Sequence, residues 1–211
     1  AFRRFERLRD ALKTRYGYVQ GDINWSGVLN LALDLRGQEF FLDMMDAPEP
    51  VAARLRQIAE VIERFAVGVQ VETGTSSIAV NRTVRHFARP VFRHSECSNT
   101  MISAEDYERF ILPIDTAWSE RHRPFGIHHC GKDPHRFAAS YAKLPHLDFL
   151  DVGWGGDVRA VRAALPETFL NLRLDPVQLV GWTPVQVRAT ILDLVAESSN
   201  PWLTGVCCTN L

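Results

Sequence analysis

From residue 125 onward, short β-rich runs alternate with amphipathic helical runs. The expected strands are 125–129, 147–152, 168–174 and 202–207, and the expected helices between them are 134–144, 157–165 and 183–197. Strict alternation of this kind predicts parallel strands joined by helical crossovers, in either an open doubly wound sheet or a closed (β/α)8 barrel. No G-x-G-x-x-G motif follows a strand, which disfavours the dinucleotide-binding form of the open sheet.

The first half of the chain is predicted to contain longer helices and fewer strands. Its expected helices are 2–15, 27–35 with Ser26 as the N-terminal cap, 46–74, and 103–122 with Ser103 as the cap; its expected strands are 16–20, 77–80 and 91–94. A (β/α)8 barrel needs eight strands and about 250 residues, whereas this chain has 211. We therefore expect one domain over residues 1–211, a TIM-type barrel that is incomplete at the N-terminus and lacks the last helix. The unpaired sheet edge of such a chain predicts self-association or a complementing chain.

Composition narrows the range of partners. The chain has 24 Lys and Arg against 25 Asp and Glu, a net charge of -1, so it has no large basic field for nucleic acid or an anionic membrane surface. No apolar run approaches the roughly 20 residues of a membrane-spanning helix, and the first ten residues lack the apolar core of a secretion signal. We therefore expect a cytoplasmic protein. Its four cysteines are too few for a disulfide scaffold, so they are either small buried apolar residues or thiols available for metal binding or catalysis.

The segment "GIHHCGKD", residues 126–133, places two imidazoles and a thiol at successive positions at the end of an expected strand. Side chains alternate between the two faces of a strand, so His128 and Cys130 share one face while Ile127 and His129 share the other. Apolar Ile127 suits the face that packs against helices, which leaves His128 and Cys130 facing the interior of a barrel. Zinc binds nitrogen and sulfur ligands, and a catalytic zinc site has three protein ligands and one open position.

The thiols at the end of the last expected strand, Cys207 and Cys208, are the candidates for the third ligand. The four candidate catalytic and metal-binding residues are His128, Cys130, Cys207 and Cys208. Two other interpretations remain: a cysteine nucleophile with His128 as its base, or a structural histidine with unreactive thiols.

Other strand ends carry candidate substrate-binding residues, because the chemistry of a barrel enzyme lies at the carboxyl ends of its strands. These candidates are Trp25, Glu96, Asp151, Trp154, Arg173 and Asp175. Glu96 stands in "HSECSNT" with His94 and Cys97, where a further ligand or a supporting carboxylate fits, although a solvated loop is the simpler interpretation. Trp25 could equally pack in the core, Trp154 could lie in a tight turn, and Asp175 could cap a helix.

Five segments resemble, in order and spacing, the uroporphyrinogen decarboxylase superfamily, which includes the cobalamin-dependent (methylcobamide:thiol) methyltransferases. They are "ISAEDYERFILPIDTAW", "GIHHCGKD", "LDFLDVGWGGD", "FLNLRLDPVQLVGWTPVQVRATILDLV" and "LTGVCC". The resemblance implies a (β/α)8 barrel with its site at the carboxyl ends of the strands. In the methyltransferase branch, a His-x-Cys pair and a cysteine near the last strand bind zinc, and these positions match His128, Cys130, and Cys207 or Cys208.

The resemblance implies a zinc-dependent transfer of a methyl group to a small-molecule thiol, with the methyl-corrinoid donor on a separate protein. The decarboxylase branch carries a histidine where this chain has Cys207 and Cys208. A decarboxylase acting on a tetrapyrrole or another polycarboxylate is nevertheless the alternative, with Arg93 and Arg173 as candidates for binding carboxylates. A non-catalytic metal- or corrinoid-binding protein is the third interpretation.

Overall fold

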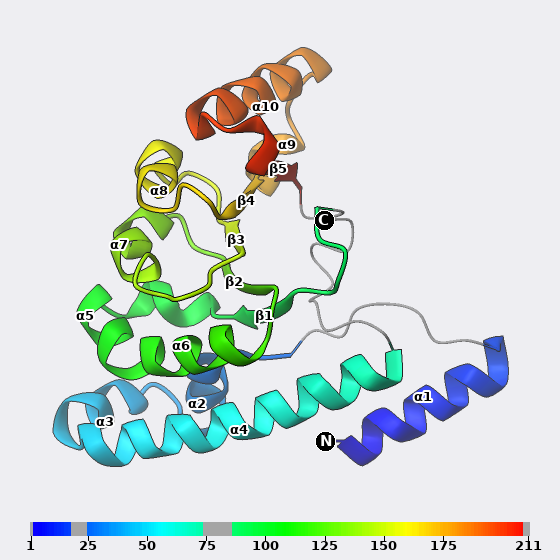
Figure 1. The fold of residues 1–211 in the computed structure, drawn as a ribbon, viewed down its shortest axis with the longest axis vertical. Helices are drawn as coiled ribbons and strands as arrows, with labels where there is room; N and C mark the ends of the chain where they lie inside the picture. The colour runs from blue at the N-terminus through cyan, green and yellow to red at the C-terminus, as the bar shows by residue number, and fades with distance from the viewer. Residues whose placement is uncertain (1, 18–24, 74–85, 209–211) are drawn as a thin grey trace.

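The computed structural model describes residues 2–17, 25–73 and 86–208, and a five-stranded parallel sheet lies at its centre (Figure 1). The strands are β1 (Phe92–Ser95), β2 (Phe125–His129), β3 (Phe149–Val152), β4 (Phe169–Arg173) and β5 (Thr204–Cys207). Their order in the sheet is their order in the chain, and every neighbouring pair is parallel. A doubly wound sheet reverses its strand order at one point, so this sheet instead fits part of a singly wound (β/α) fold.

Helical segments connect every pair of successive strands. They are η2 (Cys97–Met101), α5 (Ala104–Asp106), η3 (Tyr107–Ile111) and α6 (Leu112–Arg121) before β2; η4 (Pro134–Phe137) and α7 (Ala138–Tyr141) before β3; α8 (Val158–Ala164) before β4; and α9 (Pro176–Leu179), α10 (Pro184–Ser198) and η5 (Pro201–Leu203) before β5. Figure 1 shows α5 to α8 on one side of the sheet. Parallel strands require such crossovers, which explains the strict alternation in the sequence.

Among the residues that the structure describes, four helices precede the sheet: α1 (Phe2–Tyr16), α2 (Val28–Arg36), α3 (Phe40–Asp46) and α4 (Pro48–Thr73). The long helix α4 contacts both α2 and α3. Its apolar positions, including Val51, Leu55 and Ile62, are buried along one face, as their spacing predicts. Within the described ranges, no helix has both the length and the apolar character needed to cross a bilayer.

The five strands predicted from residue 91 onward are all present, with ends that shift by up to two residues. The strand predicted at 16–20 is wrong at its start, since Tyr16 ends helix α1. Its residues 18–20 lie outside the described residues. The strand predicted at 77–80 also lies outside them. The helix predicted at 134–144 is a 3-10 turn followed by the short α7. A partial (β/α) fold is therefore present, and the closed eight-stranded barrel remains a prediction.

The N-terminus of α2 differs from the prediction in an informative way. Its N-cap is Gly27, which offers no side chain, so the prediction that Ser26 caps this helix is wrong. The carboxylate of Glu96 accepts the Leu29 N–H instead, with its two oxygens at 3.0 and 3.2 Å. A Cβ at Gly27 would lie 1.9 Å from Glu96 Oε1, so a glycine is needed for this approach. The helix start is thus capped by a carboxyl group from a strand end distant in sequence.

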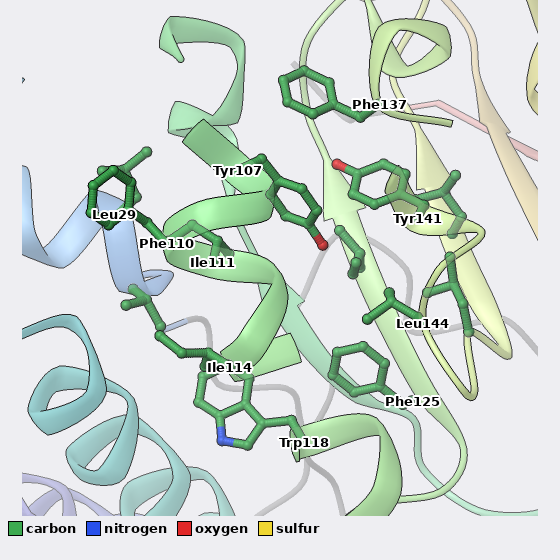
Figure 2. Packing of buried hydrophobic residues seen from close by; sticks show 14 of the residues in the cluster. Leu29, Tyr107, Phe110, Ile111, Ile114, Trp118, Phe125, Phe137, Tyr141 and Leu144 are labelled. Atoms are coloured by element: carbon green, nitrogen blue, oxygen red, sulfur yellow. The ribbon is translucent and has the colours of Figure 1, made fainter. Parts of the chain in front are cut away.

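The main core lies between the helices and the outer face of the sheet, which carries Ile127, Leu150 and Leu170. Figure 2 shows Tyr107 of η3 pointing toward Tyr141 of α7, and the two rings lie edge to face with their centres 5.3 Å apart. Burial of each such side chain contributes about 1.5–3 kcal/mol. The inner face carries a smaller apolar cluster, Val91, Phe149 and Phe169 with Phe87 against it, and polar residues toward the strand ends.

Candidate metal centre

A row of polar side chains crosses the inner face of the sheet. In the strand register, Ser95 pairs with His128, His128 with Asp151, and Asp151 with Asn171. Paired residues on neighbouring strands point to the same face, so these side chains meet. His128 Nδ1 pairs with Asp151 Oδ2, and Asn171 Nδ2 donates to Asp151 Oδ1 at 3.1 Å. The sequence alternation along β2 therefore aims His128 at the inner face, away from Ile127.

Three potential ligands converge at the end of β1 and β2. Cys97, His128 and Cys130 each offer one ligand atom, and these atoms all lie within 4.8 Å of one another. Cys97 begins η2 just after β1, His128 belongs to β2, and Cys130 follows β2 directly. Tetrahedral zinc has Zn–S bonds of about 2.3 Å and Zn–N bonds of about 2.0 Å, so its ligand atoms are separated by roughly 3.3–3.8 Å. The observed spacing fits such an ion after a small contraction of the cluster.

Asp151 completes the arrangement expected around a metal-binding histidine. Its side chain is fully buried and engages His128 Nδ1, which leaves Nε2 as the nitrogen available to a metal. Metal-binding histidines usually give their other ring nitrogen to a carboxylate, which fixes the ring and its tautomer. The donor set of two sulfurs and one imidazole could therefore hold a borderline-soft ion such as zinc, with one coordination position left open.

Hydrogen bonding shifts the pKa values of the two thiols in opposite directions and raises the pKa of the imidazole. Hydrogen bonds to Cys97 and then to His128 hold the pKa of Cys130 well below the ordinary thiol value. Burial lowers the pKa of His128, but its hydrogen bonds to Asp151 and Cys130 outweigh burial and raise it. The pKa of Cys97 is raised by its hydrogen bond to Cys130 and by burial. The shift at Cys130 thus favours its thiolate form, and a bound cation would favour ionisation of both sulfurs.

Two predicted substrate-binding residues lie beside this cluster. Arg173 Nη1 donates to Cys130 Sγ at 3.4 Å, and its guanidinium lies 5.6 Å from the centre of the Trp154 ring. Arg93 is buried on the same face, with its guanidinium 4.7 Å from the centre of the Phe149 ring. The inner face therefore combines a sulfur pair with positive charge and an aromatic ring.

The structure places three other predicted residues in supporting positions. Glu96 is buried and caps α2, Asp175 accepts the N–H groups of Val177 and Gln178 at the start of α9, and Trp25 packs in the main core. His129 is buried on the outer face, where its ring nitrogens face Tyr141 Oη at 2.8 Å and Asp133 Oδ1 at 3.3 Å. The alternation of β2 predicted this outward position for His129.

Cys207 and Cys208 are not members of the three-residue group found among the described residues. Cys207 Sγ accepts a hydrogen bond from Asn171 Nδ2 at 3.2 Å, and Cys208 is exposed. Three strand spacings separate β5 from β2, a distance of about 14 Å. Cys97 takes the place that the sequence predicts for Cys207 or Cys208. The register pairs Ser95 with His128, and Cys97 follows Ser95 by two residues as Cys130 follows His128. This equal spacing is the sequence signal for Cys97 as a candidate ligand.

Comparison with known proteins supplies no family for this chain. No family model matches it, and a search of curated proteins finds no significant match.

Proposed function

We propose that this protein is a zinc-dependent methyltransferase that transfers a methyl group from a methyl-corrinoid, held on a separate protein, to a small-molecule thiol. The observation that carries the proposal is the convergence of Cys97, His128 and Cys130 at the carboxyl ends of neighbouring parallel strands. Barrel enzymes build their sites at these strand ends. The five-stranded sheet would be part of a (β/α)8 barrel, as the sequence resemblance implies.

Zinc bound here would supply a Lewis acid that lowers the pKa of an incoming thiol, so that a thiolate forms at neutral pH. Asp151 holds the Nδ1 proton of His128 and so keeps Nε2 directed at the ligand position. Arg173 donates to the Cys130 sulfur and places positive charge beside it. In the transfer, the acceptor sulfur loses its proton and forms a bond to the methyl carbon, while the electron pair of the cobalt–carbon bond stays with the corrinoid.

A decarboxylase that acts on a tetrapyrrole or another polycarboxylate is the second candidate. The buried arginines Arg93 and Arg173 favour it, since both lie on the inner face of the sheet. Burial raises the pKa of Asp151, but the interaction with His128 and the positive charges of Arg93 and Arg173 outweigh burial and lower that pKa. Guanidinium groups bind carboxylates through paired hydrogen bonds. Such an enzyme would work without a metal.

The metal content of the purified protein tests the first candidate. We expect about one zinc per chain, and near-complete loss in the variants Cys97→Ser, Cys130→Ser and His128→Ala. Cys207→Ser and Cys208→Ser are the matched controls and should keep the ion. Loss of zinc in Cys207→Ser but not in Cys97→Ser would instead support the ligand set expected from the sequence.

Activity separates the three functions. Protein with zinc bound should convert methylcobalamin and a simple thiol such as 2-mercaptoethanol into demethylated cobalamin and thioether, followed by cobalamin absorbance. Metal-free protein that decarboxylates a polycarboxylic porphyrinogen would support the second candidate. Bound zinc without methyl transfer to any thiol would indicate a non-catalytic metal- or corrinoid-binding protein.

A further inference from the structure

The two sulfurs of the candidate metal centre come from two segments that touch at one point. Cys97 lies in η2 and Cys130 in the loop after β2, and these segments meet at Thr100 and Gly131. A Cβ built on Gly131 would lie only 1.9 Å from Thr100 Cγ2. The backbone beside Cys130 can therefore approach η2 this closely only because residue 131 has no side chain.

Gly131 is also confined from the other side. A Cβ built on Gly153, in the loop after β3, would lie 1.9 Å from the Gly131 carbonyl oxygen and 2.8 Å from that of Cys130. The loop after β2 thus lies between η2 and the loop after β3. The glycines at 131 and 153 thus allow close approach on both flanks of this loop.

Hydrogen bonds tie the same contact to the ligands. Thr100 Oγ1 donates to the Cys97 carbonyl oxygen at 3.3 Å, which joins Thr100 to the ligand one turn before it. Arg136 donates to the Thr100 carbonyl oxygen at 3.2 Å and to Asp133 Oδ2 at 2.9 Å, which joins η2 to the loop that follows Cys130. A displacement at the contact would therefore move Cys97 relative to Cys130.

We infer that Gly131 and Thr100 are positioning residues that set the separation of the Cys97 and Cys130 sulfurs for metal binding. This inference rests on the metal site of the proposed function, although neither residue offers a ligand atom to that site. A methyl group at 131 must open the contact from 1.9 Å to the 3.4 Å at which ordinary contact begins, a shift of about 1.5 Å. Metal–ligand distances tolerate deviations of only about 0.2 Å, so this shift would separate the sulfurs too far for one ion.

The test compares Gly131→Ala, Thr100→Ser and the double variant by titration of the metal-free full chain with Co²⁺ alone. The absorbance of the cobalt–thiolate bonds reports how many sulfurs bind, and zinc competition gives the affinity. Gly131→Ala should weaken binding by about 10–100-fold, the range seen when supporting residues of metal sites are changed. Thr100→Ser keeps the hydroxyl that reaches Cys97 and should bind within about threefold of the parent.

The double variant should recover most of the affinity, because Thr100→Ser removes the methyl group that a side chain at 131 would meet. The next atom, Asp133 Oδ1 at 2.9 Å, is the end of a side chain and can move. Gly181→Ala is the matched control, since its Cβ would meet its nearest atom at 3.7 Å. Urea midpoints of the metal-free variants separate lost affinity from lost stability.

Parent-like Co²⁺ affinity in Gly131→Ala would overturn the inference, and so would a double variant that regains the urea midpoint without the affinity. If Gly131→Ala does not fold, the double variant decides: it must fold and bind within about threefold of the parent. A parent that binds Co²⁺ through both sulfurs but transfers no methyl group would refute the proposed function alone. A parent that binds no Co²⁺ would refute both.

Discussion

Two histidines on neighbouring strands, His94 of β1 and His128 of β2, each pair with an aspartate, but on opposite faces of the sheet. On the outer face, His94 Nδ1 lies 2.5 Å from Asp115 Oδ1, and both side chains are fully buried. On the inner face, His128 Nδ1 pairs with Asp151, also in a buried setting. The two pairs have the same chemistry, so the surroundings of the second ring nitrogen must decide what each pair does.

The second nitrogen of His94 faces groups that belong to the fold. Its Nε2 lies 3.2 Å from the Val28 N–H and 3.3 Å from Glu96 Oε1, at the start of α2. Burial lowers the pKa of His94, but the Asp115 and Glu96 carboxylates outweigh it and raise the pKa to about 10. The second nitrogen of His128 has two sulfurs nearby instead. His94 thus uses both ring nitrogens in contacts within the fold, whereas His128 keeps one ring nitrogen available to a metal ion.

The largest expected effect comes from His94→Ala. It removes the imidazole that lies between the buried carboxyl groups of Asp115 and Glu96, and removal of one member of a buried charged pair costs about 3–5 kcal/mol. We expect this loss in the free energy of urea unfolding, with zinc content per folded chain unchanged. His146→Ala, which touches neither pair, is the control. Loss of zinc without loss of stability would show that His94 supports the metal site rather than the fold, contrary to the comparison of the two histidines.

Asp151→Asn should have an intermediate effect, confined to the metal. Asn171 Nδ2 already donates to one oxygen of residue 151, so the new amide NH₂ would face His128 Nδ1. Nδ1 of His128 must then accept a hydrogen bond from this amide, so the ring proton moves to Nε2. A proton on Nε2 blocks the nitrogen that would bind the metal. We expect zinc affinity to fall about 10–100-fold with little change in unfolding. Competition with a chelator measures the zinc affinity, and Asp175→Asn is the control. A zinc affinity equal to that of the parent would show that Asp151 does not support the metal site.

The smallest effect is expected at a third, more exposed pair, in which His122 Nε2 lies 2.6 Å from Glu63 Oε1. Burial raises the pKa of Glu63, but hydrogen bonds from Arg121, His122 and Trp118 outweigh it, so the pKa falls below its ordinary value of 4.5. A lowered pKa stabilises the fold above the ordinary value, and this contribution is lost as the pH falls through the lowered pKa.

Glu63→Gln should therefore reduce the free energy of unfolding at neutral pH. Between neutral pH and about pH 3, the variant should lose less of this free energy than the parent does. Urea midpoints across this range measure the difference. Glu60→Gln on the same helix is the matched control. An acid dependence identical to the parent's would show that the Glu63 pair contributes nothing, and zinc binding should not respond to either change.

The alternation of strands and helices was predictable because parallel strands need crossovers and their apolar runs are short. Residues 125–129, for example, form a strand with the predicted bounds. The cap of α2 was not predictable from local sequence. Glu96 lies in the chain far from Leu29, and only the packing of β1 against α2 brings its carboxylate to that helix.

The candidate site was predictable in part. Alternation within β2 correctly placed His128 opposite to Ile127 and His129, because side chains of a strand point to alternate faces. The sequence allows a further ligand in the segment that holds Glu96 and Cys97, but the two cysteines at the last strand end were preferred as partners of Cys130, whereas the structure groups Cys97 with His128 and Cys130. Consecutive strands of a (β/α) unit usually lie side by side, so Cys97 at the end of the preceding strand was geometrically nearer than either.

The sequential strand order has a consequence for folding. All three potential ligands come from β1, β2 and the turns that directly follow them, so the site is encoded within one βαβ unit. Closing a short loop costs less entropy than joining distant strands. An ion bound here would link the ends of β1 and β2, and the free energy of binding would stabilise these two strands directly. Backbone amides of β1 and β2 should therefore gain the greatest protection from hydrogen exchange when zinc is added.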